Sequence, residues 1–270
     1  MRLLLAVGPP RTATTWLDLA FRSNPGILAP RRKELNYFDL YYMRGLTWYL
    51  GQFGKPSAER ELLLAEACPS YASNLAVIDR VGGFIGEVKV VISVRDPVER
   101  AVSSWRMRLR RNNLKMSFSE YVSEYVEAVR DSSFSEFVPR WLEAMDPADI
   151  RLLDSQSLDD PIAVMSSLAS WAGVPNEWEF PSVRVNPGGR AKHPRLMATA
   201  TNVGRGLRGA GLERVLEWSP LRALQSRVGA VMDGSPDLQP RAQDVASLRE
   251  ILGADYLFLD RIARRRDLWL

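Results

Sequence analysis

The sequence predicts an α/β protein with a central parallel sheet flanked by helices, followed by a helical C-terminal part. Two apolar runs carry this prediction, RLLLAV at Arg2–Val7 and VKVVISV at Val88–Val94. Each has the length of a buried strand, and each leads through a turn into residues with helical spacing. Strands that alternate with helices favour a doubly wound sheet with right-handed crossovers between parallel strands.

The boundaries of these elements follow from residues that break the apolar runs. The first strand is expected to end at Gly8, Pro9 and Pro10, and a helix is expected from Thr14 onward. The second strand leads through Arg-Asp-Pro into a helix over about Val98–Arg111. Two weaker strand candidates are Leu62–Glu66 and Ile150–Leu153.

The second half of the chain is predicted to be mostly helical. From about Ser117 to Trp171 the helical pattern is punctuated by Pro139, Pro147 and Pro161. The segment Pro175–Pro194 is dense in proline, glycine and charge, which predicts a long loop. Three helical stretches follow, the last from about Gln243 to Arg265. No repeat or linker divides the chain, so a single domain over residues 1–270 is expected.

Composition narrows the class of partner. The chain has 36 Lys and Arg against 32 Asp and Glu, which suits an anionic ligand but not a nucleic acid. The single cysteine, Cys68, excludes an intrachain disulfide and favours a reducing, cytoplasmic location. No run approaches the roughly 20 apolar residues that cross a bilayer, so no membrane insertion is expected. The sequence leaves the oligomeric state open.

The loop after the first strand has the composition of an anion site. In GPPRTATTWL, which begins at Gly8, backbone N–H groups and the positive end of a helix can face a phosphate or sulfate. A nucleoside triphosphatase loop would need glycine at Ala13, lysine at Thr14 and a hydroxyl at Thr15. The lysine is absent, and the cation stands earlier, at Arg11. The pattern predicts a P-loop-like cradle with no bound metal, and a plain capped turn is the alternative.

A second motif follows the next strong strand, in VRDPVERAVSSW. Arg95 leaves the sheet at the carboxyl end of that strand, and Ser103 stands two helical turns further on. An arginine can bind a phosphate with two parallel hydrogen bonds while the hydroxyl donates another. The pair therefore predicts a second phosphate site. The alternative is that Arg95 forms a surface ion pair and Ser103 is ordinary helix surface.

Taken together, six segments resemble, in order, the sulfotransferase superfamily, and in detail its heparan sulfate branch and the related bacterial sulfotransferases. Two are the phosphate motifs just described. The other four are KELNYFD at Lys33–Asp39, RGLTWYLGQF at Arg44–Phe53, EACPSY at Glu66–Tyr71 and GGRAKHP at Gly188–Pro194. The match runs nearly end to end.

The resemblance implies a donor and a set of donor-binding residues. The donor would be 3′-phosphoadenosine 5′-phosphosulfate (PAPS), which leaves adenosine 3′,5′-bisphosphate (PAP) as product. The resemblance assigns the 5′-phosphosulfate to the residues of the first loop and the 3′-phosphate to the second motif, with the late loop closing over the donor. These residues are Arg11, Thr12, Ala13, Thr14, Thr15, Arg95, Ser103, Gly189 and Arg190.

The catalytic assignments also come from the resemblance. Glu34 matches the family's catalytic glutamate and would be the base, with Arg11 stabilising charge on the donor side. Lys33 would stabilise charge there too, and plain surface charge is the alternative for it. Most relatives have lysine at Arg11, and because arginine stays charged its role would be electrostatic. The only histidine, His193, is the alternative base. An ion pair of Glu34 with Lys33, Arg31 or Arg32 is expected to compete weakly, because adjacent side chains seldom face one another in an extended segment.

Further departures from the family pattern are Ala67 and Gly188, where relatives carry lysine. About half of the aromatic residues after the base are expected to be core, and the others could stack on an acceptor: Tyr37, Phe38, Tyr41, Tyr42, Trp48 and Tyr49.

The expected reaction moves a sulfuryl group from PAPS to a hydroxyl or amine of a carbohydrate, lipid or secondary metabolite. The partner is thus a small-molecule or glycan acceptor, and a bacterial member of the family is expected. A nucleotide-dependent kinase that uses ATP and magnesium is the rival enzyme. A non-catalytic nucleotide-binding module is the remaining alternative.

Overall fold

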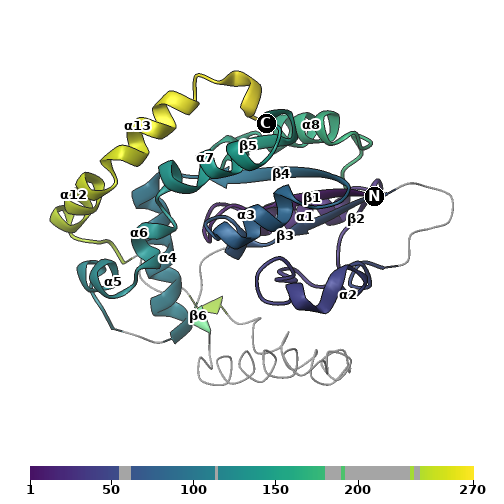
Figure 1. Ribbon diagram of the computed structural model, residues 1–270. Helices are drawn as coiled ribbons and strands as arrows, with labels where there is room; N and C mark the ends of the chain where they lie inside the picture. Colours follow the sequence, from purple (N-terminus) through teal and green to yellow (C-terminus); the bar gives the residue numbers. More distant parts are fainter. Residues whose placement is uncertain (55–61, 113–114, 180–189, 192–231, 234–237) are drawn as a thin grey trace.

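A five-stranded parallel sheet forms the centre of the molecule (Figure 1). The computed structural model describes residues 1–54, 62–112, 115–179, 190–191, 232–233 and 238–270. The strand order is β2-β3-β1-β4-β5. The strands are β1 (Arg2–Ala6), β2 (Ile27–Leu28), β3 (Leu63–Ala67), β4 (Glu87–Val94) and β5 (Ile150–Asp154). The predicted parallel sheet and its four predicted strands are confirmed, and β2 was not predicted.

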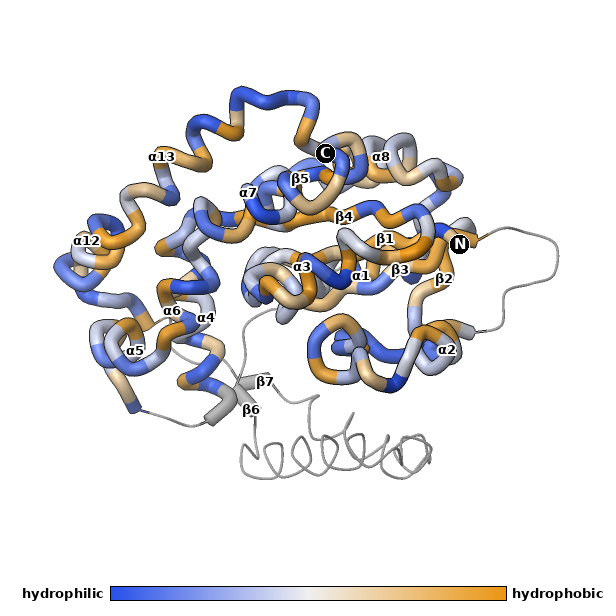
Figure 2. The backbone as a smooth tube through the Cα atoms, in the orientation of Figure 1, coloured by the Kyte–Doolittle hydropathy of each residue, from blue (hydrophilic) through white to orange (hydrophobic). Residues whose placement is uncertain are grey.

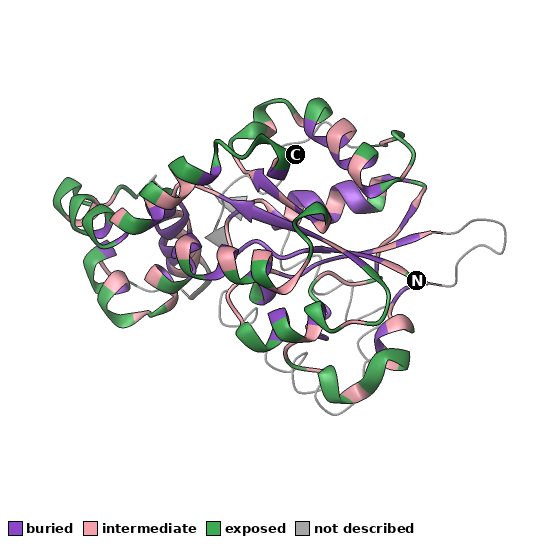
Figure 3. Cartoon of the chain, turned by 45° about the horizontal axis from the view of Figure 1, so that its top comes forward, coloured by how far each residue is buried: buried purple, intermediate pink, exposed green. Residues whose placement is uncertain are grey.

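Helices cover both faces of the sheet, because successive apolar side chains of β1 point alternately to one face and the other. Leu3 and Leu5 point into one core cluster, which α3 (Leu75–Gly82) and α7 (Phe134–Ala144) cover. Leu4 and Ala6 point into a second cluster, covered by α1 (Thr14–Ser23) and α8 (Pro161–Ala172). The strands are apolar on both sides, as a sheet covered on both faces requires. Figure 2 shows this apolar centre, and Figure 3 shows the buried strands between helices with exposed outer faces.

A third apolar cluster lies beside the sheet. It joins α4 (Pro97–Asn112), α5 (Phe118–Glu124), α6 (Glu127–Arg130) and α12 (Ala242–Ile251). Helix α13 (Gly253–Ile262) follows and packs against α7. The helical stretch predicted from about Gln243 to Arg265 is helical but is divided into two helices at Leu252. Leu252 is buried in the third cluster, whereas Ile262 is buried in the first.

Three prolines were predicted to interrupt the helical pattern, and two of them do so. Pro161 begins α8 and Pro147 begins a 3-10 turn, whereas Pro139 lies inside α7, so that prediction was wrong. A proline in a helix lacks one N–H and disrupts the bond to the carbonyl four residues earlier. Packing outweighs this cost, because Val138 and Trp141 on either side are completely buried.

The remaining elements are short. They are α2 (Gly45–Leu50) and the 3-10 turns η1 (Tyr42–Arg44), η2 (Pro69–Tyr71), η3 (Pro147–Asp149), η4 (Ser157–Asp159) and η5 (Arg266–Leu268). Strands β6 (Arg190–Ala191) and β7 (Met232–Asp233) pair antiparallel. Most of the predicted loop Pro175–Pro194, including Gly189 and His193, lies outside the described residues, as do the helical stretches expected before position 232. Among the helices that the structure describes, none is both long and apolar enough to cross a membrane.

Candidate functional site

The strand register brings three connecting segments to one edge of the sheet. Ala6 at the end of β1 pairs with Ala67 at the end of β3, while β4 continues to Val94. The loop after β1, the segment after β3 and Arg95 after β4 therefore leave the sheet on the same side. In open parallel sheets, ligands bind beyond the carboxyl ends of the strands.

Close packing against β4 shapes the loop after β1. A Cβ atom at Gly8 would lie 1.7 Å from Ser93 Oγ and 2.7 Å from the Ser93 carbonyl oxygen, so glycine alone fits there. The Thr12 hydroxyl is buried and bonds the Pro9 carbonyl oxygen and Ser93 Oγ, both at 2.7 Å. Arg11 and Ala13 have φ angles of 80° and 70°. The side chain of Thr12 thus connects this loop to β4 of the sheet.

Lys33 connects this loop to the segment that carries Glu34. Its Nζ donates to Thr15 Oγ1 at 3.0 Å and to Thr14 Oγ1 at 3.4 Å. The same Nζ lies 3.3 Å from Glu34 Oε1. The Glu34 side chain is 51% exposed, which leaves its carboxylate open to a ligand.

The ion pair between Lys33 and Glu34 corrects the expectation that these neighbours would not meet. That expectation assumed an extended segment. Glu34 instead has a φ angle of 61° and Asn36 one of 57°, both in the left-handed region. The backbone therefore turns at Glu34 and brings the two side chains together. The pair holds the carboxylate beside the loop after β1.

Two residues of the second motif, Arg95 and Ser103, form hydrogen bonds with Arg11 of the first. Arg11 Nε donates to Ser103 Oγ at 2.9 Å, so the predicted cation and the predicted hydroxyl meet across the two motifs. Arg95 Nη1 donates to the Arg11 carbonyl oxygen at 3.4 Å, and Arg95 also pairs with Glu99 at 3.2 Å. Ion-pair formation by Arg95 was the alternative interpretation, and the structure contains this pair. Whether Arg95 also binds a phosphate stays a prediction.

A cavity of about 670 Å³ lies at this edge of the sheet. Of the predicted site residues, it is bordered by Arg11, Thr14, Thr15, Lys33 and Glu34. Its size is that of pockets that hold drug-sized ligands and cofactors. The cavity lining combines three cationic side chains (Arg11, Lys33 and Arg130), two carboxylates (Glu34 and Asp131) and the start of α1, where no acidic side chain or side-chain cap occupies the first turn. Such a combination suits an anionic ligand beside a reacting proton.

The other predicted residues lie outside the lining of this cavity. Ser103 acts through Arg11, as described, and Ala13 begins the turn before α1. Arg190 is placed in β6, but the structure describes only its backbone. Within the part of the chain that the structure describes, no group of three potential ligands from His, Cys, Asp and Glu could hold a metal ion.

Glu66 is a feature whose role the sequence motif did not reveal. It is completely buried at the end of β3 and accepts three hydrogen bonds. The donors are Leu35 N at 2.9 Å, the Tyr49 hydroxyl at 2.8 Å and the Tyr71 hydroxyl at 3.2 Å. Because Leu35 follows Glu34 directly, Glu66 anchors the backbone of the candidate base. An acidic residue in the apolar run LLLAEA was the only sequence signal for this role.

Burial changes the acidity of this carboxyl group. Loss of hydration raises the pKa of Glu66 from 4.5 to about 7, although the hydrogen bonds from Tyr49, Leu35 and Tyr71 act in the opposite direction. The desolvation effect is the larger. Burial, with the negative charge of Glu66, also raises the pKa of Tyr49 well above its usual value. Glu66 therefore exchanges a proton near neutral pH while holding the segment next to Glu34.

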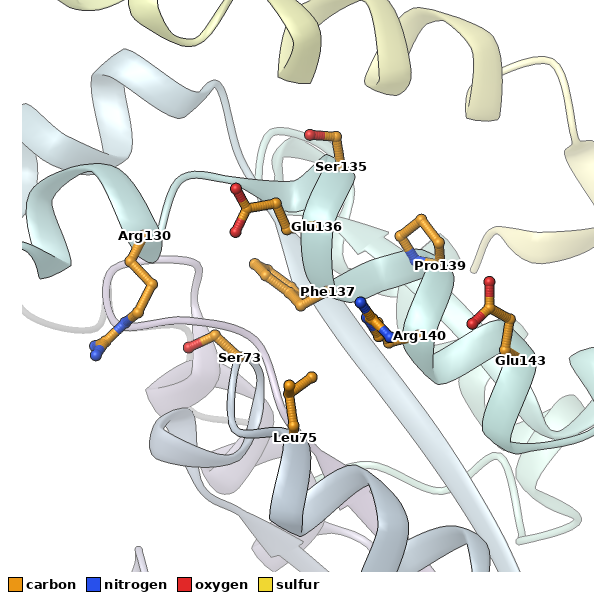
Figure 4. Close-up of a pocket in the computed structure, with 9 residues that line it drawn as sticks. All are labelled: Ser73, Leu75, Arg130, Ser135, Glu136, Phe137, Pro139, Arg140 and Glu143. Atoms are coloured by element: carbon orange, nitrogen blue, oxygen red, sulfur yellow. The ribbon is translucent and has the colours of Figure 1, made fainter.

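A second cavity of about 600 Å³ lies next to the first (Figure 4). The two cavities share Ser73, Leu75 and Arg130 in their walls. In Figure 4, Ser73 and Leu75 lie opposite side chains of α7, among them Glu136 and Arg140. The two cavities therefore adjoin at the three shared residues, and the second cavity lies against α7.

Comparison with known proteins identifies the class that this fold and edge site define. The family model of the sulfotransferase domain matches residues 2–187. The chain belongs to this family, and the resemblance drawn from the motifs is confirmed. The sulfotransferase of Alicyclobacillus acidocaldarius has a similar fold, with a TM-score of 0.60 and 19% identity, covering 82% of this chain and 99% of that one.

Two curated relatives are more similar in sequence. The chain is 31% identical over 132 residues to the membrane-associated sulfotransferase kil1 of Dictyostelium discoideum, covering 46% of this chain and 28% of that protein. It is 29% identical over 192 residues to the human bifunctional heparan sulfate N-deacetylase/N-sulfotransferase 3, covering 63% of this chain and 22% of that protein. The matched part is thus about a quarter of either relative's length.

Proposed function

We propose that this chain transfers a sulfuryl group from PAPS to a hydroxyl or amine of an acceptor. The observation that carries the proposal is the contact between Lys33 and the Thr15 hydroxyl, which brings Glu34 to the same cavity as Arg11. A base and two cations around one cavity are the groups that such a transfer needs. Membership of the sulfotransferase domain family supports the assignment.

The residues present fit the donor. The phosphosulfate end would lie on the loop from Gly8 to Thr15, where Arg11 and Lys33 supply positive charge and the start of α1 supplies backbone N–H groups. Ser103 and Arg95 would serve the 3′-phosphate, and Gly189 and Arg190 would lie in a loop over the donor. PAP is the expected product, and no metal is needed in this arrangement.

The transfer itself needs placement and charge stabilisation. The sulfur–oxygen bond to the 5′-phosphate breaks as the acceptor oxygen or nitrogen bonds to sulfur, much as in phosphoryl transfer. Glu34 accepts the proton that the acceptor releases. Negative charge grows on the departing phosphate oxygen, and Arg11 and Lys33 stabilise it electrostatically. Arg11 does this without giving up a proton, because its guanidinium stays charged.

The acceptor is proposed only as a class. A carbohydrate, lipid or secondary metabolite that bears a hydroxyl or amine would enter from the Glu34 side. An elongated acceptor would extend toward the second cavity, which shares Ser73 and Leu75 with the first. We further propose that the chain acts as a single domain, and a cytoplasmic location stays a prediction from Cys68 alone.

Ligand-dependent melting tests the donor. The chain should be stabilised by PAP, and ATP with magnesium should give no greater shift. Stabilisation by ATP with magnesium but not by PAP would contradict the proposal. It would favour the nucleotide-dependent kinase instead, for which the comparisons give no support. Transfer is then measured with sulfur-labelled PAPS and an extract of the source organism, followed by mass spectrometry for a gain of one sulfuryl group.

Replacing Glu34 by glutamine tests the base. Glu34→Gln should keep PAP affinity and lower the transfer rate by about 10²–10⁴-fold, the usual contribution of a positioned base. Glu124→Gln removes an exposed carboxylate from α5 and is the matched control. Normal transfer by the Glu34 variant would remove Glu34 from the mechanism, and His193 would be the next residue to replace.

A further inference from the structure

Among the residues that the structure describes, exposed large apolar side chains are most closely spaced at positions 40–46. Leu40, Tyr42, Met43 and Leu46 are 66%, 37%, 95% and 37% exposed. These four residues are called the 40–46 patch below. In the part of the chain that the structure describes, no other seven consecutive residues hold more than two exposed large apolar side chains. Single exposed apolar residues are common, but a contiguous group marks an interaction site.

The backbone beneath the 40–46 patch is firmly held. Leu40 N and Tyr41 N both donate to the Asn36 carbonyl oxygen at 3.0 Å. The Tyr37 ring packs 5.5 Å from Tyr42 and stacks 4.4 Å from the completely buried Tyr49. The patch is therefore a fixed projection on a buried aromatic base. Its side chains stay exposed because the fold presents them outward.

Cationic side chains border the 40–46 patch. The Arg44 guanidinium lies 4.9 Å from the Tyr41 ring and 5.0 Å from the Trp48 ring, and Arg80 lies 4.4 Å from the Tyr42 ring. The surface thus combines protruding aliphatic residues, aromatic rings and arginines.

Asp39 is the carboxylate on this stretch, and it lies half-buried. Asp39 Oδ2 accepts a 2.6 Å hydrogen bond from Ser70 Oγ, and Asp39 Oδ1 accepts one from Leu40 N. Both oxygens of Asp39 are thus engaged toward the protein. Asp39 keeps its negative charge in these bonds, but Arg44 and Arg80 outnumber it, so the three groups together favour a negatively charged partner.

We propose that the 40–46 patch binds the surface of an anionic phospholipid bilayer. Leu40, Met43 and Leu46 enter the boundary between headgroups and acyl chains, while Arg44 stays among the phosphates. Met43 exposes 95% of its side chain, so the patch protrudes, as insertion between lipids requires. This mode is interfacial and needs no membrane-spanning helix.

The position of the 40–46 patch gives the binding a consequence for the site. Ser70, which bonds Asp39 at the base of the patch, also lines the main cavity beside Glu34. A bound bilayer would lie next to the acceptor side of the cavity. If the proposed sulfuryl transfer holds, on which this step rests, hydroxyl groups carried by lipids are the acceptors with the shortest path to Glu34.

Vesicle sedimentation tests the binding. The full chain should sediment with vesicles of phosphatidylcholine and phosphatidylglycerol in equal parts, and much less with phosphatidylcholine alone. The triple variant Leu40→Ser, Met43→Ser, Leu46→Ser should partition at least ~10-fold more weakly, since each serine removes buried apolar area. Arg44→Gln should weaken binding to the anionic vesicles, and added salt should weaken wild-type binding.

The matched control removes exposed apolar side chains elsewhere. Ile162→Ser with Leu257→Ser changes residues that are 74% and 68% exposed, and it should bind vesicles like wild type. Equal melting temperatures exclude misfolding of the triple variant. No sedimentation of wild type with anionic vesicles, or wild-type sedimentation by the triple variant, would overturn the proposal.

A protein partner is the competing occupant. If wild type is a dimer by light scattering and the triple variant a monomer that binds vesicles normally, the patch joins two copies and the proposal is wrong. Vesicle binding requires neither donor nor transfer. Its failure would therefore leave the proposed function standing, and failure of PAP binding would leave the 40–46 patch untouched.

Discussion

Replacing Glu66 by glutamine is expected to remove part of the pH dependence of stability. Burial raises the pKa of Glu66 from 4.5 to about 7 in the folded chain. At a pH between these two pKa values, Glu66 keeps its proton in the folded protein, whereas it has lost it in the unfolded chain. The free energy of unfolding therefore falls as the pH rises through this range, and it recovers when the pH is lowered.

The magnitude follows from the size of the shift. Each pKa unit corresponds to about 1.36 kcal/mol, so a rise from 4.5 to about 7 corresponds to about 3 kcal/mol. Glutamine has nearly the same shape, stays neutral and can still accept the bond from Leu35 N. Relative to wild type, Glu66→Gln should thus gain about 3 kcal/mol in going from below pH 4.5 to above pH 7.

The assay is urea unfolding of both proteins over a series of pH values, followed by tryptophan fluorescence. The difference between the two free energies of unfolding is the quantity to plot, because titrations of other groups cancel in it. Glu124→Gln, at an exposed position on α5, is the control. A difference between Glu66→Gln and wild type that stays constant with pH would refute the argument that burial governs this carboxyl group.

Two further predictions concern packing at the base of the site. Gly8→Ala should lower the free energy of unfolding by about 1–3 kcal/mol and weaken PAP binding, because its Cβ would lie 1.7 Å from Ser93 Oγ. Urea unfolding and calorimetric titration measure both effects, and a variant as stable as wild type would show that β1 and β4 separate easily. Arg100 is completely buried and donates to Ser132 Oγ and to the Glu127 and Ala128 carbonyl oxygens, so Arg100→Ala should cost about 3 kcal/mol or more. Arg100→Lys should recover only part of this loss, because lysine lacks the planar fork, and equal unfolding midpoints for the two variants would contradict that role.

Strand and helix patterns predicted most of the fold because they are local. The apolar runs at β1 and β4 are bounded by Gly8 and Pro97, which have few structural alternatives. Strand β2 has two residues, too few to show any period. The turn at Leu252 and the proline inside α7 depend on which distant helix each stretch packs against. Such tertiary choices leave no local pattern in the sequence.

The candidate site divides in the same way. Arg11, Thr15 and Glu34 could be proposed from motifs, since loops after parallel strands meet at one edge, and their roles stay predictions. The contact between Lys33 and Glu34 could not be predicted, because a left-handed backbone at a glutamate has no sequence signal. The hydrogen bond from Leu35 N to Glu66 joins residues 31 positions apart and depends on the complete sheet.

The distribution of backbone strain gives an independent reason to place function at this edge. In the part of the chain that the structure describes, only four residues other than glycine have positive φ angles: Arg11, Ala13, Glu34 and Asn36. Each such residue costs about 1–2 kcal/mol, so chance would not be expected to gather all four in two short segments that face one cavity.

The surrounding contacts show how this strain is maintained. Thr12 ties the first strained segment to Ser93, and Glu66 ties the second through Leu35. Lys33 then links the two segments through Thr15. Because both strained segments are bound to the sheet, the cations and the carboxylate keep fixed positions before any ligand arrives. Fixed charges need little reorganisation during a reaction, which is the property that a transferase for a charged group requires.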